Sequence, residues 1–211
     1  MFEIEYKGGN GIVLSTKKMT ALVDPKLSVV GLKDISTRGG VEIATEARFA
    51  TNDDEAQLRV EGPGEYEIGP FAIHGTATTR HLDTTADPKA STMYRVMIGD
   101  VRIAVIGNIS PVLTDAQLEE LGLIDILILP VGGNGYTLDA TSAASIVRSV
   151  DPKVVIPTSY ADNGLKYEVA QDPLELFIKE LGAAHETVAK YKVKTASSLP
   201  AGLTVVEVTR D

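Results

Sequence analysis

The sequence contains no cysteine and no tryptophan, and only three of its 211 residues are histidines. Without cysteine the chain cannot form disulfides, thiolate metal sites or a cysteine nucleophile, and such a composition fits a reducing cellular interior. No apolar run approaches membrane-spanning length, and the first residues lack a basic stretch followed by an apolar one. We therefore expect a cytoplasmic protein with no membrane partner.

Positive charge is also scarce, because 20 lysines and arginines stand against 29 acidic residues and give a formal net charge of −9. The basic residues are scattered, whereas neutralising phosphates requires a clustered basic surface, so we expect no nucleic-acid partner. The hydrophobic share of 44% is ample for a buried core. No linker or repeat divides the chain, which predicts a single domain over residues 1–211 and leaves oligomerisation open.

Short apolar runs separated by turn residues fill the first half of the sequence and predict β-strands. We expect these strands, paired antiparallel, at residues 2–6, 11–16, 20–24, 41–45, 57–61, 65–69 and 71–75. Residues 91–107 predict a β-hairpin, because Gly99 and Asp100 separate two runs rich in β-branched residues and supply the positive φ of a tight turn.

Helix signals begin at Thr114, which is expected to cap a short helix with Gln117 as its capping-box partner and Gly122 beyond its end. Asp139 is expected to cap a second helix, between buried strands at 125–130 and 153–157.

A third helix is expected to have Asp172 as N-cap, Pro173 at its first position and Gly182 as its stop, before closing strands at 188–194 and 203–210. Strands followed by alternating strands and helices are typical of an α/β or layered α+β domain.

Several segments together resemble the metallo-β-lactamase fold superfamily, in the branch of small Zn-dependent hydrolases related to ascorbate-6-phosphate lactonase. These segments are GIVLSTKKMTALVDP (11–25), GPGEYEIGPFAIHG (62–75), LTDAQLEELGLIDILILPVGGNGYTLDATSAASIV (113–147) and PKVVIPTSY (152–160). The resemblance implies a four-layer αββα sandwich, with two mixed β-sheets flanked by helices. It also implies an edge site where His and Asp residues hold one or two metal ions that activate water for hydrolysis.

The metal ligands that this resemblance implies are altered in the sequence. The family's His-x-His-x-Asp-His motif, which follows a strand, is expected within residues 32–47, and these contain no histidine. Asn108 stands where the family has a bridging aspartate, and Ser159 stands where it has its last histidine. His81 resembles the family's middle histidine, with Asp83 close by in sequence. We therefore expect no bound metal and no other cofactor.

The leading interpretation is a non-catalytic binding or interaction protein whose edge cleft accepts a small anionic ligand. The candidate cleft residues are Arg38, His81, Asp83, Asn108, Gly132, Gly133, Ser159 and Tyr160. Arg38 would supply fixed positive charge beside backbone N–H groups of the glycine-rich loop, although a solvated arginine in a turn fits the same sequence. The two glycines fit better as residues that turn the backbone before the second helix.

The alternative interpretation is a metal-dependent hydrolase of esters, lactones or phosphoesters. It would hold one zinc or manganese ion through His81, Asp83 and Asp24. A third interpretation is a subunit whose sandwich serves only as a scaffold for assembly.

Overall fold

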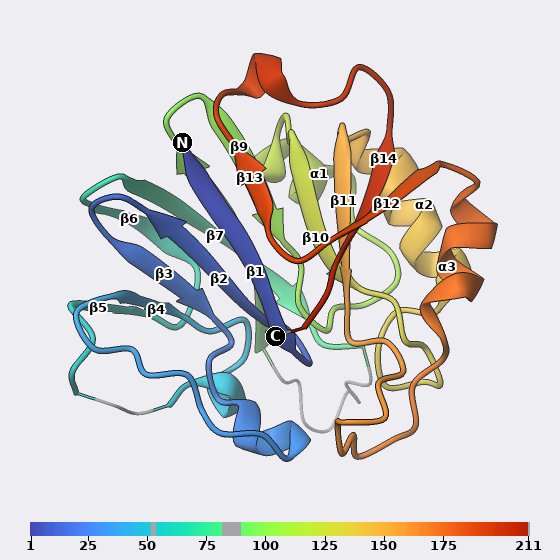
Figure 1. Ribbon diagram of the computed structural model, residues 1–211, viewed down its shortest axis with the longest axis horizontal. Coiled ribbons are helices and arrows are strands. Elements are labelled where there is room, and N and C mark those ends of the chain that lie inside the picture. The colour runs from blue at the N-terminus through green and yellow to red at the C-terminus, as the bar shows by residue number, and fades with distance from the viewer. Residues whose placement is uncertain (52–53, 82–89, 211) are drawn as a thin grey trace.

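Two mixed β-sheets face each other in the computed structural model, which describes residues 1–51, 54–81 and 90–210 (Figure 1). The six-stranded sheet has the order β13 (Tyr191–Val193), β1 (Phe2–Gly8), β2 (Gly11–Thr16), β3 (Thr20–Val23), β4 (Val41–Ile43), β5 (Leu58–Val60). The eight-stranded sheet has the order β12 (Ala184–Val188), β14 (Thr204–Val208), β11 (Val154–Thr158), β10 (Ile126–Pro130), β9 (Val101–Val105), β8 (Ala90–Ile98), β7 (Phe71–Thr79), β6 (Gly64–Ile68). The expected sandwich of two mixed sheets is confirmed.

The main core lies between the sheets, and β1 shows how the sequence builds it. Phe2, Ile4 and Tyr6 are buried on the inner face, because alternate residues of a strand point to the same side of the sheet. Glu3 and Glu5 point outward and form ion pairs with lysines that lie beside β13 or within it. The outer face of β1 is therefore polar at these two positions.

A second core lies between the eight-stranded sheet and three α-helices, α1 (Asp115–Leu121), α2 (Ala140–Val150) and α3 (Leu174–Leu181). Leu121, Val147 and Phe177, one from each helix, pack in this cluster. Figure 1 shows α2 and α3 on the side of this sheet that faces away from the six-stranded sheet. Among the described residues no α-helix covers the six-stranded sheet, which has only the short 3-10 helices η1 (Leu27–Val30) and η2 (Ala47–Phe49) at its end. A third 3-10 helix, η3 (Ala196–Ser198), precedes β14.

The expected strand pairing is wrong in one part of the six-stranded sheet. β3 pairs with β4, and β4 with β5, in parallel rather than antiparallel. After each strand the chain crosses back to the end of the sheet where that strand began, so the next strand runs in the same direction. The alternation of apolar residues predicts a strand but not its direction relative to its neighbour. The parallel pairing places the carboxyl ends of the three strands at one edge.

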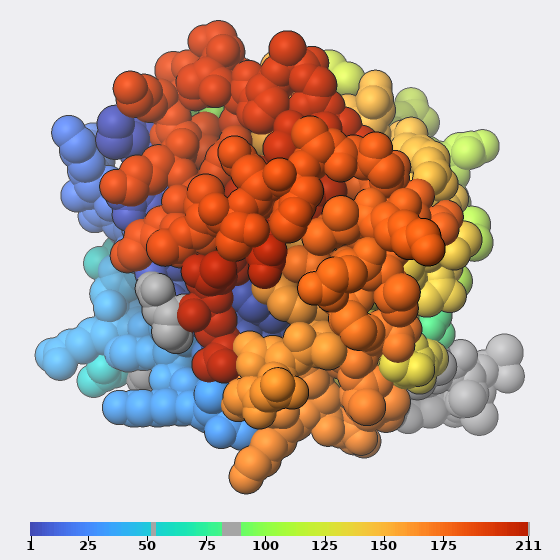
Figure 2. All heavy atoms as spheres, turned by 45° about the vertical axis from the view of Figure 1, so that its right-hand side comes forward, coloured from blue at the N-terminus to red at the C-terminus, as the bar shows by residue number. Residues whose placement is uncertain are grey.

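The closing strand expected at 188–194 is also wrong, because two short strands occupy this region. β12 ends at Val188 in the eight-stranded sheet, and β13 begins at Tyr191 in the six-stranded sheet. Figure 2 shows the orange and red C-terminal segments, which include β12 to β14, gathered over one face of the molecule. They supply an edge strand to each sheet.

Most of the expected helix and turn signals are confirmed. Thr114 and Gln117 form the capping box of α1, the side chain of Asp139 caps α2, and Gly99 turns the β8–β9 hairpin with φ 64°. The cap of α3 is wrong by one residue: Pro173 occupies the N-cap position, and the side chain of Asp172 instead accepts a hydrogen bond from Asn134 at 2.9 Å. None of the helices in the described ranges is long and apolar enough to cross a membrane.

Candidate functional site

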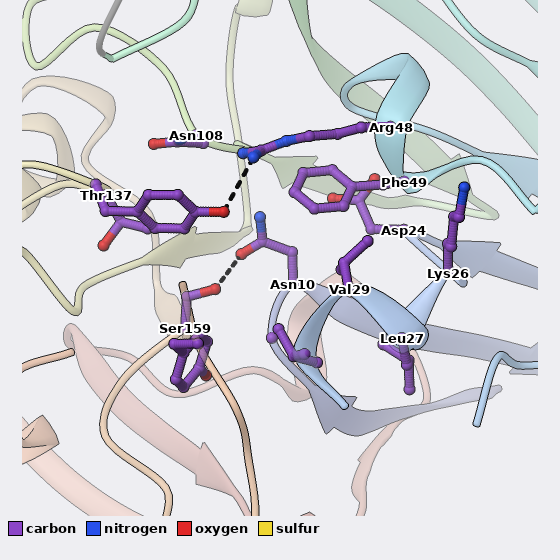
Figure 3. A pocket seen from close by; sticks show the side chains of 14 residues that line it. Asn10, Asp24, Lys26, Leu27, Val29, Arg48, Phe49, Asn108, Thr137 and Ser159 are labelled. Carbon is purple, nitrogen blue, oxygen red and sulfur yellow. Dashed lines mark hydrogen bonds between the residues drawn. The ribbon is translucent and has the colours of Figure 1, made fainter. Parts of the chain in front are cut away.

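A pocket opens at the edge of the sandwich where loops from both sheets meet (Figure 3). Asp24 follows β3 and Arg48 follows β4, while Asn108, Tyr136 and Ser159 follow β9, β10 and β11. All five strands end at this edge, because they run parallel within their sheets. Carboxyl ends of parallel strands are a frequent place for ligand sites in α/β folds.

The backbone is strained at two positions in the pocket. Asp24 has φ 47° and Ser159 has φ 49°, a left-handed conformation that residues with a side chain rarely adopt. Such strain is retained where the surrounding structure holds it, and it concentrates at functional sites. Here the backbone N–H of Ser159 donates to Gly9 and that of Asp24 donates to Ile43, both at 2.9 Å.

Asp24 is a buried carboxyl group, only 2% exposed, and Thr45 holds both of its oxygens. The backbone N–H of Thr45 donates to Oδ1 and its hydroxyl donates to Oδ2, each at 2.7 Å. Burial raises the pKa of Asp24 to about 7, although the hydrogen bonds from Thr45 oppose the shift. The carboxylate of Glu46 raises this pKa further, and the guanidinium of Arg48 lowers it.

Arg48 spans the pocket and is the centre of an ion-pair network. Its Nη1 donates to the hydroxyl of Tyr136 at 3.0 Å, and its Nε lies 2.9 Å from Oε2 of the buried Glu46. The guanidinium carbon lies 4.6 Å from the ring centre of Phe49, within cation–π range. Arg80 approaches the same Glu46 oxygen at 3.3 Å. Burial disfavours the charge of Arg48, but Glu46 and Tyr136 outweigh it and raise the pKa of Arg48.

Amide and hydroxyl groups line the rest of the pocket. The hydroxyl of Ser159 donates to Asn10 Oδ1 at 2.6 Å (Figure 3). Asn108 is 3% exposed, and its side-chain oxygen accepts no hydrogen bond from the described residues. A buried acceptor without a donor costs about 1–3 kcal/mol, so Asn108 is a point where an additional donor would stabilise the site.

The structure brings some of the sequence-predicted residues together. Asn108 and Ser159 line the same pocket, and Asp24 of the alternative metal set lines it as well. The backbone N–H of His81 donates to the carbonyl of Asn108 at 3.3 Å, which places His81 next to the pocket loop. Asp83 lies outside the described residues.

Other sequence-predicted residues lie away from this pocket. Arg38 lines a separate surface hollow, with its side chain 80% exposed and its Nε 3.9 Å from Glu55. Arg38 therefore occupies the solvated position that its sequence context also fitted. The ring of Tyr160 is half-buried against Tyr6, with 5.7 Å between ring centres.

The two glycines shape the loop beside the pocket. A Cβ at Gly132 would collide with the carbonyl oxygen of Ser159 and with Gln171. Gly133 has φ 65°, and its N–H donates to the carbonyl of Leu138 at 3.0 Å. This N–H is therefore used inside the loop, which supports a conformational role for Gly133.

Three residues of the site, Arg48, Glu46 and Asn10, are not among those predicted from the sequence. The metal motif was expected within residues 32–47, a range that contains Glu46 but ends before Arg48, whereas the segment that follows β4 is 44–51. The signal that identifies this segment is the charged pair Glu46 and Arg48, separated by one residue and placed shortly after the strand Val41–Ile43. For Asn10 the sequence offers only a Gly-Asn-Gly turn between two strands, and such turns are common.

The residues around the pocket do not fit a metal ion. Within residues 1–51, 54–81 and 90–210, no three His, Cys, Asp or Glu side chains gather closely enough to hold one. The oxygens of Asp24 accept hydrogen bonds from Thr45, and Glu46 is paired with Arg48. The charges of Arg48 and Lys26, which both line the pocket, would also repel a cation.

Comparisons with known proteins agree with the fold. A family model described as a beta-lactamase superfamily domain matches residues 3–159. No curated protein matches the chain. A candidate Zn-dependent hydrolase of the metallo-β-lactamase superfamily from Thermotoga maritima is similar in structure, with 21% identity, a TM-score of 0.74 and coverage of 99% of this chain and 100% of that chain.

Two further solved structures are similar over nearly their whole length. A metallo hydrolase from the archaeon Ignicoccus hospitalis has 14% identity and a TM-score of 0.64, with 99% of this chain and 95% of that chain covered. The metallo-β-lactamase fold protein YhfI from Bacillus subtilis has 10% identity and a TM-score of 0.58, with 98% and 96% covered. At these identities the similarity shows the fold alone.

Proposed function

The chain belongs to the metallo-β-lactamase superfamily, and we propose that it is a metal-free binding protein. Within the superfamily we propose that it is related to the branch of small Zn-dependent hydrolases that includes ascorbate-6-phosphate lactonase. Its edge pocket would bind a small molecule without converting it. The observation that carries this proposal is the network in which Glu46 and Arg48, after β4, meet Tyr136, after β10, across the pocket.

The charge of the pocket supports binding without a metal. In a hydrolase of this fold, a metal ion supplies the positive charge and the activated water. Here the Arg48 guanidinium lies at the pocket as a permanent cation, since arginine stays protonated at any physiological pH. Its partner Glu46 is buried, with 4% of its side chain exposed, so the pair is a fixed part of the structure.

The hydroxyl groups of the pocket also lack the arrangement of an acyl-transfer site. A serine nucleophile needs a base that accepts its proton, usually histidine. Ser159 instead donates to Asn10 Oδ1, and an amide oxygen is too weak a base for this role. The pocket is therefore better suited to hold a ligand than to attack it.

Elemental analysis of the untagged protein, after exposure to zinc, manganese and iron and removal of free metal, tests this proposal. The proposal predicts far less than one metal ion per chain, and equally little in the variant His81→Ala. Hydrolysis assays with esters, lactones and phosphodiesters are expected to show no turnover. Near-stoichiometric metal and turnover that both disappear in His81→Ala would establish the alternative hydrolase with a mononuclear site.

A further inference from the structure

The eight-stranded sheet ends at β6, and this edge strand is open to pairing with another strand. β6 pairs with β7 along its whole length without a bulge, and no strand of the described ranges lies on its other side. The backbone N–H and C=O groups on that side can therefore pair with an added strand. Figure 1 shows β5, the edge strand of the other sheet, on the same side of the molecule.

The outer face of β6 carries negative charge. Glu65 and Glu67 both point to this face, because alternate residues of a strand share one side of the sheet. The side chain of Glu65 is 88% exposed and lies 3.6 Å from Nδ1 of His74. Glu67 is also exposed, and it forms no ion pair within the described part of the chain. Opposite charges that face each other across a strand pair stabilise it, so these carboxylates favour a basic partner strand.

The approach to these carboxylates is open. A hollow lies beside them on the outer face of β6, β7 and β8, with a cavity volume of about 390 Å³, measured for the centres of water-sized spheres. The small side chain of Ala72 lies between Glu67 and Met97 in the pairing of the three strands. Arg95 lines the hollow and donates to the carbonyl of Leu121, at the end of α1, at 2.9 Å. Side chains of an added strand can therefore reach the carboxylates without displacing any part of the protein.

The inner face of β6 is apolar and only partly covered. Tyr66 and Ile68 alternate with the glutamates and pack against the main core, but both remain half-buried. Leu58 of β5 and Met19, just before β3, are half-buried against the same core. Side chains on one face of two neighbouring strands lie close together. An apolar side chain of an added strand would therefore bury more of Tyr66 and Ile68, which is favourable.

We infer that β6 is a docking edge for an extended peptide segment of another protein in which basic and apolar residues alternate. The main chain of the segment pairs with β6, its lysine or arginine side chains face Glu65 and Glu67, and its apolar side chains lie beside Tyr66 and Ile68. The formal net charge of −9 attracts such a segment from a distance. This surface is separate from the edge pocket, so the inference does not depend on the metal content of the protein.

A second copy of this chain fits the β6 edge less well. Two β6 strands paired antiparallel about Tyr66 would bring Glu65 of each copy opposite Glu67 of the other, and like charges directly opposite are destabilising. β12 lies at the other edge of the same sheet and lacks the alternation, because its central residues 185–187 are polar and exposed. The alternation of acidic and apolar residues therefore favours β6 and a basic partner.

NMR titration of the isotope-labelled protein with synthetic peptides tests the chemistry of the partner. The probe is Gly-Lys-Val-Lys-Val-Lys-Gly with blocked ends, and it is expected to shift the resonances of residues 64–68. One comparison peptide has glutamate in place of lysine, and another has the lysines and the valines in separate blocks. Both are expected to bind at least about tenfold more weakly. No binding by the probe, shifts confined to other residues, or equal binding by either comparison peptide would overturn the inference.

Two N-methylated forms of the probe test the main-chain pairing. One is methylated at the valine nitrogens and the other at the lysine nitrogens. Because the N–H groups of alternate residues point to opposite sides of a strand, only one of these two sets can face β6. One form is therefore expected to lose binding and the other to keep it. Equal binding by both forms would show that charge alone holds the peptide, and would overturn strand addition.

Substitutions at the two glutamates assign the binding to β6. Glu65→Gln combined with Glu67→Gln is expected to weaken binding of the probe about tenfold, because both charge pairs are lost. The matched control combines Glu186→Gln on β12 with Glu175→Gln on α3, where both side chains are exposed, and is expected to leave the affinity nearly unchanged. Equal effects of the two pairs would mean that only net charge attracts the peptide. Self-association of the free protein through β6, measured by sedimentation, would mean that the edge accepts a second copy. Either result would overturn the inference.

Discussion

Replacing Asp24 by asparagine should change how the stability of the protein depends on pH. Burial raises the pKa of Asp24 to about 7 in the folded chain, from the ordinary value of 3.8. The folded state therefore binds this proton more tightly than the unfolded state. The contribution of Asp24 to stability is complete below its pKa in the unfolded state, and it is lost as the pH rises through its pKa in the folded state. Asparagine resembles the protonated carboxyl and does not titrate, so Asp24→Asn removes this contribution.

The magnitude follows from the two pKa values of Asp24. A difference of roughly three pKa units, at about 1.4 kcal/mol per unit, gives an upper limit of about 4 kcal/mol. Urea unfolding of both proteins at several values between about pH 4 and pH 8 measures it. Relative to wild type, Asp24→Asn should become more stable by up to this amount as the pH rises. Parallel stability curves for the two proteins would mean that the folded state does not raise the pKa of Asp24.

Three further substitutions test other parts of the structure by urea unfolding. Arg48→Met should lower the free energy of unfolding by about 2–4 kcal/mol because it removes a partner of the buried Glu46 carboxylate. Adding Glu46→Gln should recover part of this loss. Equal losses in the single and double variants would contradict an interaction between Arg48 and Glu46. Gly132→Ala should cost about 3 kcal/mol or more, since its Cβ meets the carbonyl oxygen of Ser159, and a loss below about 1 kcal/mol would contradict that contact. Thr114→Ala should cost about 1 kcal/mol through loss of the capping box of α1, and an unchanged urea midpoint would mean that the cap adds nothing.

Local chemistry made part of the fold predictable from the sequence. The α1 capping box and the Gly99 turn depend on residues within a few positions of one another, and both were predicted correctly. The parallel pairing of β3, β4 and β5 depends on where the chain returns after each strand, and the pattern of apolar residues does not encode that path. The sequence therefore predicted where strands and helices form better than it predicted how the strands pair.

The pocket residues were also predicted only in part from the sequence. Asn108 and Ser159 were identified because the resemblance places each where the family has a metal ligand, and both line the pocket. Arg48 was missed because its importance comes from Tyr136, 88 residues away in sequence, and from the burial of Glu46, two residues before it. Such a contact forms only when loops of both sheets meet at one edge.

The proposed function requires that a protein cation, rather than a metal ion, lies in the edge pocket. Crystals grown with zinc, with diffraction measured at the zinc absorption edge, test it most directly. We expect no anomalous peak in the pocket and the Arg48 guanidinium between Glu46 and Tyr136. A strong peak in the pocket, with His81 or Asp24 as ligands, would contradict it.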